Sequence, residues 1–299
     1  MKCRRLIVLL GPTASGKTSL SITLAKRFHG IVISADSRQV YRGMNLGTGK
    51  VTKREMSGVP HYLLDVASPK STYTVAKYVR DVTRVIKKIS TSTPIFLVGG
   101  SPFYIDALTK PNSFSAVPPN PALRRRLDKL NTAPLMAHLL KMDPVRAKII
   151  DPFNRRRLIR AIEIAFYKSP PRARKDAKVA AMPEMKILKL GVAINKAQLH
   201  RNIDHRVDVR MRQGMEWEVQ RLHDSGVSWK KLDDFGLEYR FLSRYLRGQI
   251  SKSDADSQLK FAIRHFAKRQ MTWWKQDNEI HWISTSAGAT AIIQKWIRE

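Results

Sequence analysis

Acidic residues are scarce in this sequence. Its 299 residues include 24 Asp and Glu against 55 Lys and Arg, which gives a formal net charge of +31. An enzyme that acts only on small molecules has no need of this excess. A polyanionic partner is attracted by it, because each phosphate that is neutralised releases counterions. The charge therefore favours a nucleic-acid partner over a merely solubilising surface.

Cysteine and long hydrophobic runs are also lacking. Cys3 is the only cysteine, which excludes a disulfide and a cysteine-based metal cluster. No apolar run reaches the length of a membrane span. The start of the chain, Met1–Leu10, has basic then apolar residues as a signal peptide has, but its apolar run is short and leads directly into a glycine-rich loop. We interpret it as the first strand and expect a cytoplasmic protein that does not bind a membrane.

The stretch Gly11–Thr18 has the pattern of a phosphate-binding loop, two glycines five positions apart followed by Lys17 and Thr18. The preceding run Leu6–Leu10 is typical of a buried parallel strand, and Ser19–Phe28 has the spacing of an amphipathic helix. In this context backbone N–H groups and the helix N-terminus bind phosphate oxygens, and Lys17 adds a positive charge. The Thr18 hydroxyl can bind Mg²⁺ or a ligand oxygen. We therefore predict a diphosphate or triphosphate site.

Strands and helices alternate over the first 110 residues. The predicted elements are the buried strands Ile31–Ser34 and Ile95–Val98, the short strand His61–Val66 and the helix Thr74–Ile89. This alternation predicts an α/β fold, with a parallel sheet flanked by helices as in P-loop NTPases. Ligands bind at the carboxyl ends of such strands, so the phosphate loop, Asp36 and Gly99-Gly100-Ser101 are expected to converge on one site.

The composition changes where prolines cluster, between Pro111 and Pro121. We predict that residues 112–185 form a smaller, all-helical and basic inserted domain that binds RNA. Residues 1–111 and 186–299 are then the catalytic core.

The core is predicted to continue after the insertion. Lys186–Ile194 is expected to rejoin the sheet as a strand, and two long helices are expected at Asn195–His223 and Asp254–Trp274. On the second helix, basic residues spaced by four are expected to form one basic stripe, namely Lys260, Arg264 and Lys268.

Asp36 follows the second predicted strand and faces the predicted phosphate site. A carboxylate there is unfavourable unless it binds Mg²⁺ or takes a proton, so we interpret it as functional rather than as a turn cap. The nearby Ser37 and Gln39 offer groups suited to a base edge. The strand Ile95–Val98 ends in glycine where a P-loop NTPase usually has a magnesium-binding Asp, and Asp65 is a weaker candidate. This weakens a kinase interpretation without excluding it.

Short motifs in a fixed order run along nearly the whole chain. They are Gly11–Thr18, Ile33–Tyr41, Gly43-Met44, Gly47-Thr48, Val98–Ser101, Arg157–Glu163 and Lys268–Trp273. Together they resemble the tRNA dimethylallyltransferase family, also called tRNA isopentenyltransferase. The blocks Asp36–Tyr41 and Lys268–Trp273 make the resemblance highly specific.

The resemblance implies transfer of a dimethylallyl group from dimethylallyl diphosphate to N6 of adenine 37, next to the anticodon of a tRNA, with Mg²⁺ as cofactor. The phosphate loop would then hold the leaving diphosphate. The residues implied to bind it are Gly11, Pro12, Thr13, Ala14, Ser15, Gly16, Lys17, Thr18 and Arg206. The implied catalytic residues are Asp36 as general base, Lys17, Thr18 as a candidate Mg²⁺ ligand, Arg206 and Ser101.

A tRNA anticodon stem-loop is the implied macromolecular partner, and a monomer is sufficient to bind it. The expected tRNA contacts are Asp36, Ser37, Arg38, Gln39, Ser101, Arg124, Arg156, Arg157, Leu158, Ile159, Arg160, Lys268, Arg269, Gln270, Met271, Thr272, Trp273, Trp274 and Lys275. The two adjacent tryptophans interleave with basic residues, as stacking combined with phosphate contact requires, although at least one of them is expected to pack in the core.

The chain departs from the family pattern in two places. The family's Gly-Gly-Thr-Gly-Leu-Tyr is replaced by Gly99–Tyr104, where Pro102 fixes φ and removes a hydrogen-bond donor. The family's Gly-Tyr-Lys/Arg block aligns ambiguously with Phe235–Arg240.

Three alternatives remain at this point. An adenylate isopentenyltransferase would use the same donor but prenylate free AMP, ADP or ATP. A P-loop kinase acting on a small molecule would transfer phosphate from ATP. A nucleic-acid-binding module with a degenerate phosphate loop is disfavoured by the intact Lys17, Thr18 and Asp36.

Overall fold

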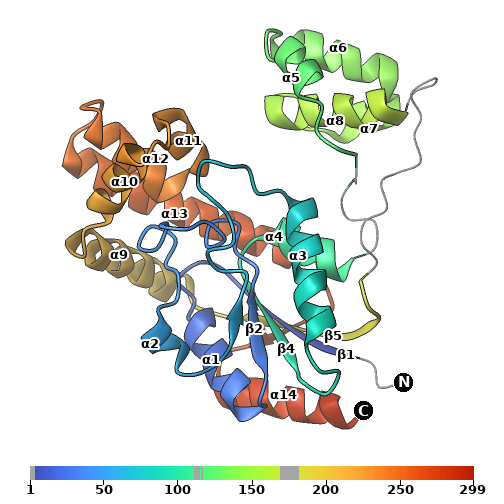
Figure 1. Ribbon diagram of the computed structural model, residues 1–299, viewed down its shortest axis with the longest axis vertical. Helices are drawn as coiled ribbons and strands as arrows, with labels where there is room; N and C mark the ends of the chain where they lie inside the picture. The colour runs from blue at the N-terminus through green and yellow to red at the C-terminus, as the bar shows by residue number, and fades with distance from the viewer. Residues whose placement is uncertain (1–3, 111–114, 116, 169–181) are drawn as a thin grey trace. The chain divides into compact units, whose positions relative to one another are not determined.

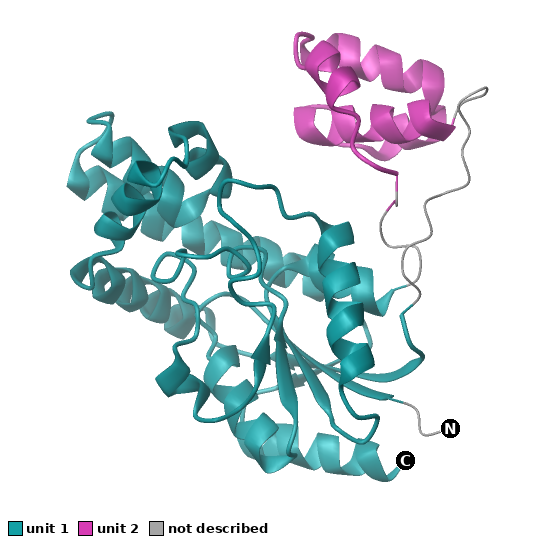
Figure 2. Cartoon of the chain, in the orientation of Figure 1, with its two compact units in different colours: residues 1–111, 182–299 teal, residues 112–181 magenta. Residues whose placement is uncertain are grey.

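The computed structural model describes residues 4–110, 115, 117–168 and 182–299. The chain divides into two compact units (Figure 2). Unit 1 comprises residues 1–111 and 182–299, and unit 2 comprises residues 112–181.

Unit 1 is built on a six-stranded sheet with the order β3-β2-β4-β1-β5-β6. Its strands are β1 (Arg4–Leu10), β2 (Ile31–Ser34), β3 (His61–Tyr62), β4 (Ile95–Gly99), β5 (Met185–Val192) and β6 (Ile280–Ile283). Every pairing is parallel. The α/β prediction is therefore confirmed, and the strand after the insertion does rejoin the sheet, directly beside β1.

Helices cover both faces of this sheet (Figure 1). The helices of unit 1 are α1 (Lys17–Arg27), α2 (Lys53–Met56), α3 (Val75–Lys88), α4 (Pro102–Thr109), α9 (Lys196–Arg212), α10 (Met215–Asp224), α11 (Trp229–Phe235), α12 (Leu237–Leu246), α13 (Lys252–Trp274) and α14 (Ser286–Arg298). The connection from β1 to β2 and that from β2 to β4 run in opposite directions along the sheet. Since such crossovers are right-handed, α1 and α3 lie on opposite faces.

The buried face beneath α1 and α14 explains the apolar strand sequences. Alternate residues of the central strands, such as Ile7, Leu9 and Phe96, pack there with Leu24 of α1 and Ile293 of α14. Burial of these side chains, at about 1.5–3 kcal/mol each, fixes the strand register and with it the height at which each strand ends.

Two predicted elements differ from the structure. The single helix predicted over Asn195–His223 is wrong, because Gly214 adopts φ +88° and separates α9 from α10. A left-handed residue cannot continue an α-helix, and glycine adopts this conformation without strain. The strand predicted over His61–Val66 is limited to His61–Tyr62, because Leu63 and Asp65 also have positive φ.

Helices are the only regular elements among the described residues of unit 2. Unit 2 contains α5 (Pro121–Leu127), α6 (Thr132–Met142), α7 (Pro144–Ile149) and α8 (Arg155–Lys168). Two of these helices begin with a side-chain cap followed by proline, as the sequence predicts: Asn120 caps α5 and Asp143 caps α7. Its core is formed by apolar residues of all four helices, among them Leu127, Leu139, Ala147, Leu158 and Ile162.

A buried carboxylate joins the helices of unit 2. Glu163 of α8 has a side chain that is 1% exposed, and it accepts hydrogen bonds from the Arg124 guanidinium at 2.6 and 2.7 Å. It also accepts bonds from the Asn120 amide and from Arg160. Burial alone would raise the pKa of Glu163, but these hydrogen bonds outweigh it and lower the pKa below its usual value.

We predict that Glu163→Gln destabilises unit 2 by about 2 kcal/mol at pH 7, because charge-assisted hydrogen bonds are lost. A carboxyl whose pKa is lowered by folding stabilises the fold above its unfolded pKa, and this stabilisation is lost as the pH falls through the folded pKa. The difference between wild type and variant should therefore shrink at acid pH. Hydrogen exchange of unit 2 peptides measures it, since all six tryptophans lie in unit 1.

The matched control is Asp128→Asn, which removes the same charge from an exposed residue of unit 2. Equal exchange rates in wild type and Glu163→Gln at pH 7 would contradict the assigned role.

Candidate active site

Three neighbouring strands, β2, β4 and β1, end at one side of the sheet. The loops that follow them line one cavity of about 830 Å³. The loops are also bonded to each other, because the Ser37 amide donates to Ser101 Oγ at 3.0 Å. The predicted convergence of the phosphate loop, Asp36 and Gly99-Gly100-Ser101 is therefore confirmed.

The phosphate loop has a backbone shaped to face an anion. Gly11, Ala14 and Gly16 have positive φ values of 148°, 62° and 85°. Gly16 caps α1 without any side-chain hydrogen bond, so the first N–H groups of this helix are available to a ligand. Lys17 Nζ folds back onto the Pro12 carbonyl at 2.5 Å, and the exposed Thr18 lines the cavity.

Gln270 of α13 holds the phosphate loop against the loop after β4. Its Oε1 accepts from the Thr13 amide at 2.9 Å, and its Nε2 donates to the Gly100 carbonyl at 2.6 Å. Since the side chain is buried, it positions these loops and is closed to solvent. The Gln270 side chain is thus engaged within the protein, and the expected contact of this position with tRNA stays a prediction.

Helix α9 presents three polar side chains spaced by four residues to the cavity: Asn202, Arg206 and Arg210. Asn202 donates to the Ala14 carbonyl, and Arg206 Nη2 donates to Thr13 Oγ1 at 2.6 Å. Arg206 Nε is buried and has no partner among the described residues. A buried charged donor without a partner is costly, so a ligand oxygen beside it would stabilise the site.

The electrostatics of the cavity point to an anion. Burial, and next the charge of Arg206, lower the pKa of Lys17 to about 7. Burial, and next the charge of Arg210, lower the pKa of Arg206 to about 10. Both pKa shifts disfavour the charged form of the side chain. An anion bound between Lys17 and Arg206 would raise both pKa values again.

Asp36 caps a turn and also lines the cavity. Its Oδ1 accepts from the Arg38 amide at 2.8 Å and from the Gln39 amide at 3.3 Å, so it does cap the turn after β2. Its Oδ2 has no hydrogen bond to a described residue, and Asp36 lines the cavity. One oxygen is thus fixed by the backbone, and the other is available to a reacting group.

The side chains of Arg38 and Gln39, which follow Asp36, form hydrogen bonds within the protein. Arg38 Nε donates to the Phe235 carbonyl, and its guanidinium lies 5.5 Å from the Phe235 ring centroid. Gln39 Nε2 donates to the Gly49 carbonyl at 3.2 Å, and its Oε1 accepts from Ser34 Oγ. The amide of Gln39, expected to read a base edge, instead ties β2 to the loop 44–50.

The loop 44–50 forms one wall of the cavity and is fixed by a buried carboxylate. Glu218 of α10 accepts from the amides of Asn45, Leu46 and Gly47 at 2.7–3.0 Å and from Tyr239 Oη at 2.8 Å. Only glycine fits at position 47, because a Cβ there would lie 2.7 Å from the Tyr239 ring.

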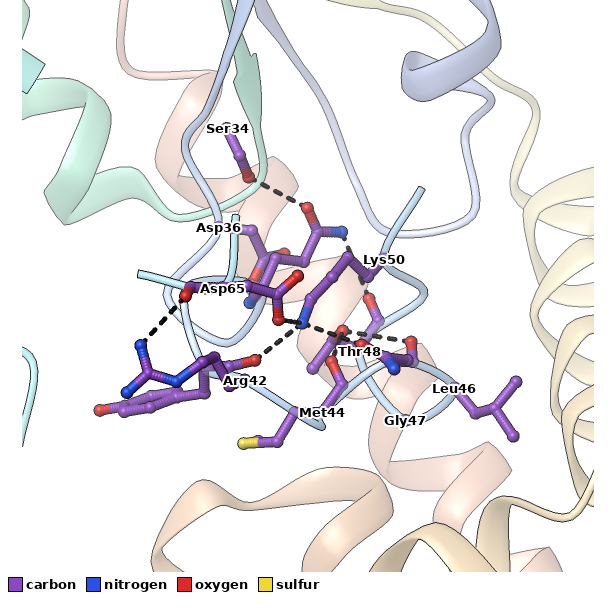
Figure 3. A network of polar contacts seen from close by, with 12 residues as sticks. Ser34, Asp36, Arg42, Met44, Leu46, Gly47, Thr48, Lys50 and Asp65 are labelled. Atoms are coloured by element: carbon purple, nitrogen blue, oxygen red, sulfur yellow. Dashed lines mark hydrogen bonds and ion pairs between the residues drawn. The ribbon is translucent and has the colours of Figure 1, made fainter. Parts of the chain in front are cut away.

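Lys50 closes this loop from the other side, as Figure 3 shows. Its Nζ donates to the Tyr41 carbonyl, to Asn45 Oδ1 and to Asp65 Oδ1 at 2.5 Å. Asp65, the weaker candidate for a kinase magnesium ligand, is thereby engaged in a structural ion pair. This removes the one acidic residue that supported a kinase.

Several expected tRNA contacts have buried or engaged side chains. The side chains of Leu158, Ile159 and Trp274 are buried in the core, and the expected tRNA contacts at these positions stay predictions. Arg124 and Arg160 bind Glu163 inside unit 2. The tRNA contacts expected at the other positions stay predictions. The expectation that at least one of the two adjacent tryptophans packs in the core is confirmed, since Trp274 is buried.

The predicted basic stripe on α13 is also wrong. Lys260 binds Asp208 at 2.5 Å and Arg264 binds Asp204, both on α9. These ion pairs neutralise two of the three cations, whereas Lys268 and Arg269 are exposed. Trp273 Nε1 donates to Asp106 of α4 at 3.0 Å.

Pro102 fits the loop after β4 because it is the first residue of α4, where no backbone donor is needed. The Ser101 hydroxyl keeps its place beside Ser37. The departure from the family pattern therefore changes the start of the helix and leaves the Ser101 contact intact.

Sequence reasoning missed Asn202, Arg210, Glu218 and the positioning role of Gln270. The spacing of Asn202, Arg206 and Arg210 by four was a signal that they share one face of α9. No local signal links Glu218 to a loop more than 170 residues earlier.

The described residues contain no group of three or more His, Cys, Asp or Glu side chains that could hold a metal ion. Along the same residues, no helix has both the length and the apolar character needed to cross a membrane.

Comparison with known proteins places this site in a family. The family model described as IPP transferase matches residues 39–277. A protein named tRNA dimethylallyltransferase 1 from Geotalea daltonii is 40% identical over 291 residues, which cover 96% of this chain and 92% of that relative. A second relative, tRNA dimethylallyltransferase 2 from Citrifermentans bemidjiense, is 41% identical over 96% of this chain and 92% of its own length.

Solved structures agree in fold. A full-length tRNA isopentenylpyrophosphate transferase from Bacillus halodurans superposes with a TM-score of 0.71 at 32% identity, covering 99% of this chain and 96% of that one. A eukaryotic dimethylallyltransferase acting on tRNA has a TM-score of 0.80 at 23% identity, covering 97% of this chain and 78% of that one, which supports the fold alone. With the phosphate loop, Asp36 and Arg206 assembled as described, the chain belongs to the IPP transferase family.

Proposed function

We propose that this protein transfers a dimethylallyl group from dimethylallyl diphosphate to N6 of adenine 37, next to the anticodon of a tRNA, and releases diphosphate. The observation that carries the proposal is one cavity that joins a phosphate loop, the half-buried cations Lys17 and Arg206, and the carboxylate of Asp36. The first two parts suit a diphosphate leaving group, and the third suits removal of a proton from an attacking amine.

In the proposed reaction, the bond between the allylic carbon and the diphosphate oxygen breaks and a bond from that carbon to N6 forms. Negative charge grows on the diphosphate, where the loop N–H groups, Lys17 and Arg206 stabilise it. The proton displaced from N6 passes to Asp36 Oδ2, while the Arg38 and Gln39 amides hold Oδ1. The adenine must leave its stack to reach this cavity.

Mg²⁺ is the proposed cofactor, and the residues present suit it. Thr18 offers a hydroxyl at the cavity, and a hydroxyl is a hard oxygen donor. Mg²⁺ is typically bound by one or two such groups together with phosphate oxygens and water, so a dedicated acidic cage is not required. When bound, the ion would neutralise part of the diphosphate charge.

The acceptor is proposed to be tRNA rather than a free adenylate. The relatives at about 40% identity carry names that specify tRNA, and the net charge of +31 suits a polyanion. A tRNA substrate also implies a cytoplasmic location. Since all the cavity groups named above come from one chain, we propose a monomer.

The deciding experiment offers labelled dimethylallyl diphosphate and Mg²⁺ with either tRNA or AMP. Label in tRNA alone supports the proposal, and label in AMP alone would establish an adenylate isopentenyltransferase. Absence of label with both acceptors, together with phosphate transfer from ATP, would favour the kinase.

We predict that Asp36→Asn lowers turnover by about 100- to 10,000-fold, the usual contribution of a general base. The amide keeps an oxygen for the Arg38 and Gln39 N–H groups, so the turn and tRNA affinity should be preserved. Single-turnover transfer and filter binding measure the two effects. Unchanged transfer would overturn the base assignment.

We predict that pyrophosphate binding at pH 8 is accompanied by proton uptake at Lys17. Because burial and Arg206 lower its pKa to about 7, Lys17 is largely neutral at pH 8, and the bound anion should raise its pKa. Calorimetry in buffers of different ionisation enthalpy measures the uptake. Lys17→Arg is the control, because an arginine remains protonated. Equal uptake by both proteins would contradict the prediction.

We predict that the double variant Lys268→Ala and Arg269→Ala weakens tRNA binding and reduces the salt slope by about 1 to 2 in log–log terms. Both side chains are exposed on α13. The control removes two exposed cations from α14, Lys295→Ala with Arg298→Ala, since α14 contributes no residue to the cavity. If both double variants have the same salt slope, α13 does not bind tRNA through these residues.

A further inference from the structure

Arg210 is a third cation at the cavity, one helical turn beyond Arg206 on α9. Its side chain is only 14% exposed. The guanidinium lies directly on the backbone of Gly49, so that a Cβ at that position would be 1.8 Å from Nη2. The group is therefore held in place between α9 and the loop 44–50.

Arg210 has an ion-pair partner, but a loose one. The nearest carboxylate oxygen, Glu238 Oε1 of α12, lies 3.9 Å from Arg210 Nη1. This separation exceeds a hydrogen bond. Burial raises the pKa of Glu238 and lowers the pKa of Arg210, and each side chain opposes the shift of the other. The attraction between the two side chains thus offsets part of the free-energy cost of burying them. The guanidinium donors of Arg210 stay available to a ligand.

Arg206 and Arg210 line the same cavity from successive turns of α9. Side chains four apart on a helix are separated by about 6 Å along its axis. Arg206 is fixed at Thr13, inside the phosphate loop. Arg210 is one turn further along α9, where its guanidinium lies against Gly49 of the loop 44–50.

The cavity also has an excess of positive charge. Its lining contains Lys17, Lys50, Arg206 and Arg210 against Asp36 and Glu55, so four cations stand against two carboxylates. Asp36 contributes favourably to the charge of Lys17, Arg206 and Arg210. The imbalance is suited to a ligand that carries several negative charges within a few ångströms.

We propose that Arg210 is a further diphosphate-binding residue, which binds the phosphate oxygens outside the loop, and that Glu238 competes with the diphosphate for its guanidinium. This inference rests on the proposed function. It assigns opposite effects to the two members of one ion pair: Arg210 strengthens diphosphate binding, and Glu238 weakens it. A purely structural ion pair would give both side chains the same effect.

An RNA phosphate is a less favoured ligand for Arg210. The guanidinium is largely buried and covered by Gly49 of the loop 44–50, whereas contacts to an RNA backbone are usually made by exposed cations. A small anion that is already held by the phosphate loop reaches this position more easily.

The test is titration of inorganic pyrophosphate with Mg²⁺ into the full chain, followed by calorimetry. We expect Arg210→Met to weaken binding by about 10- to 100-fold, as for the loss of a charge-assisted hydrogen bond. We expect Glu238→Gln to strengthen it by about three- to tenfold, since the competing charge is removed. Arg212→Met is the matched control, because it removes an exposed cation from the same helix and should leave the affinity unchanged.

Each other outcome overturns the inference. If both variants weaken binding, the pair is structural, and if neither changes it, Arg210 does not bind the diphosphate. Loss of tRNA affinity in Arg210→Met with unchanged pyrophosphate affinity would assign the residue to RNA. Failure of the wild type to bind pyrophosphate would overturn the proposed function itself.

A second variant serves as a control for misfolding of Arg210→Met. If Arg210→Met does not fold, Arg210→Lys retains the positive charge but lacks the planar donors that bind a phosphate in parallel. We expect it to bind pyrophosphate with intermediate affinity and to keep the wild-type thermal unfolding midpoint. Wild-type affinity in Arg210→Lys, together with unchanged affinity in Glu238→Gln, would again overturn the inference.

Discussion

The partial burial and mutual repulsion of three cations at one cavity are the constraint on which the rest of this site depends. Burial, and next the charge of Arg206, lower the pKa of Lys17, while burial, and next the charge of Arg210, lower the pKa of Arg206. Such an arrangement is unstable in an isolated loop. It persists because the strand order fixes the loop, and because Gln270 and Arg206 hydrogen-bond to Thr13 from two different helices. The fold thus supplies the free energy that keeps these charges together until an anion binds.

The sheet and the helices that follow it contribute differently to this site. The parallel pairing of β1 and β2 with β4 brings the phosphate loop, Asp36 and Ser101 together. Their final placement comes from groups encoded more than 150 residues later: Gln270 joins two loops, and Glu218 orders the backbone of the loop 44–50. The inserted unit interrupts the sequence between these two halves but not the sheet, because β5 pairs directly with β1.

Features that depend on residues close together in the sequence could be predicted, whereas features that depend on distant residues could not. The phosphate loop, the buried strands and the capped helices at Asn120 and Asp143 depend on neighbouring residues, and their patterns were sufficient. The basic stripe failed because Asp204 and Asp208, which neutralise it, belong to another helix. Arg210 was missed for the same reason, since its significance depends on Gly49 and Glu238. The break at Gly214 was locally visible, but a single glycine also occurs inside continuous helices.

The scarcity of acidic residues acquires a structural meaning from where those residues lie. Glu163, Glu218 and Glu238 are buried, each beside a cation or a group of backbone donors, and Asp204 and Asp208 neutralise α13. Acidic residues are therefore used to order internal groups, whereas exposed cations such as Lys268 and Arg269 have no ion pair to a described acidic residue. Some of the basic residues that make up the net charge of +31 are thus paired with acidic residues, and others are not. Because basic residues outnumber acidic residues by 55 to 24, the chain keeps the positive excess that a polyanionic substrate requires.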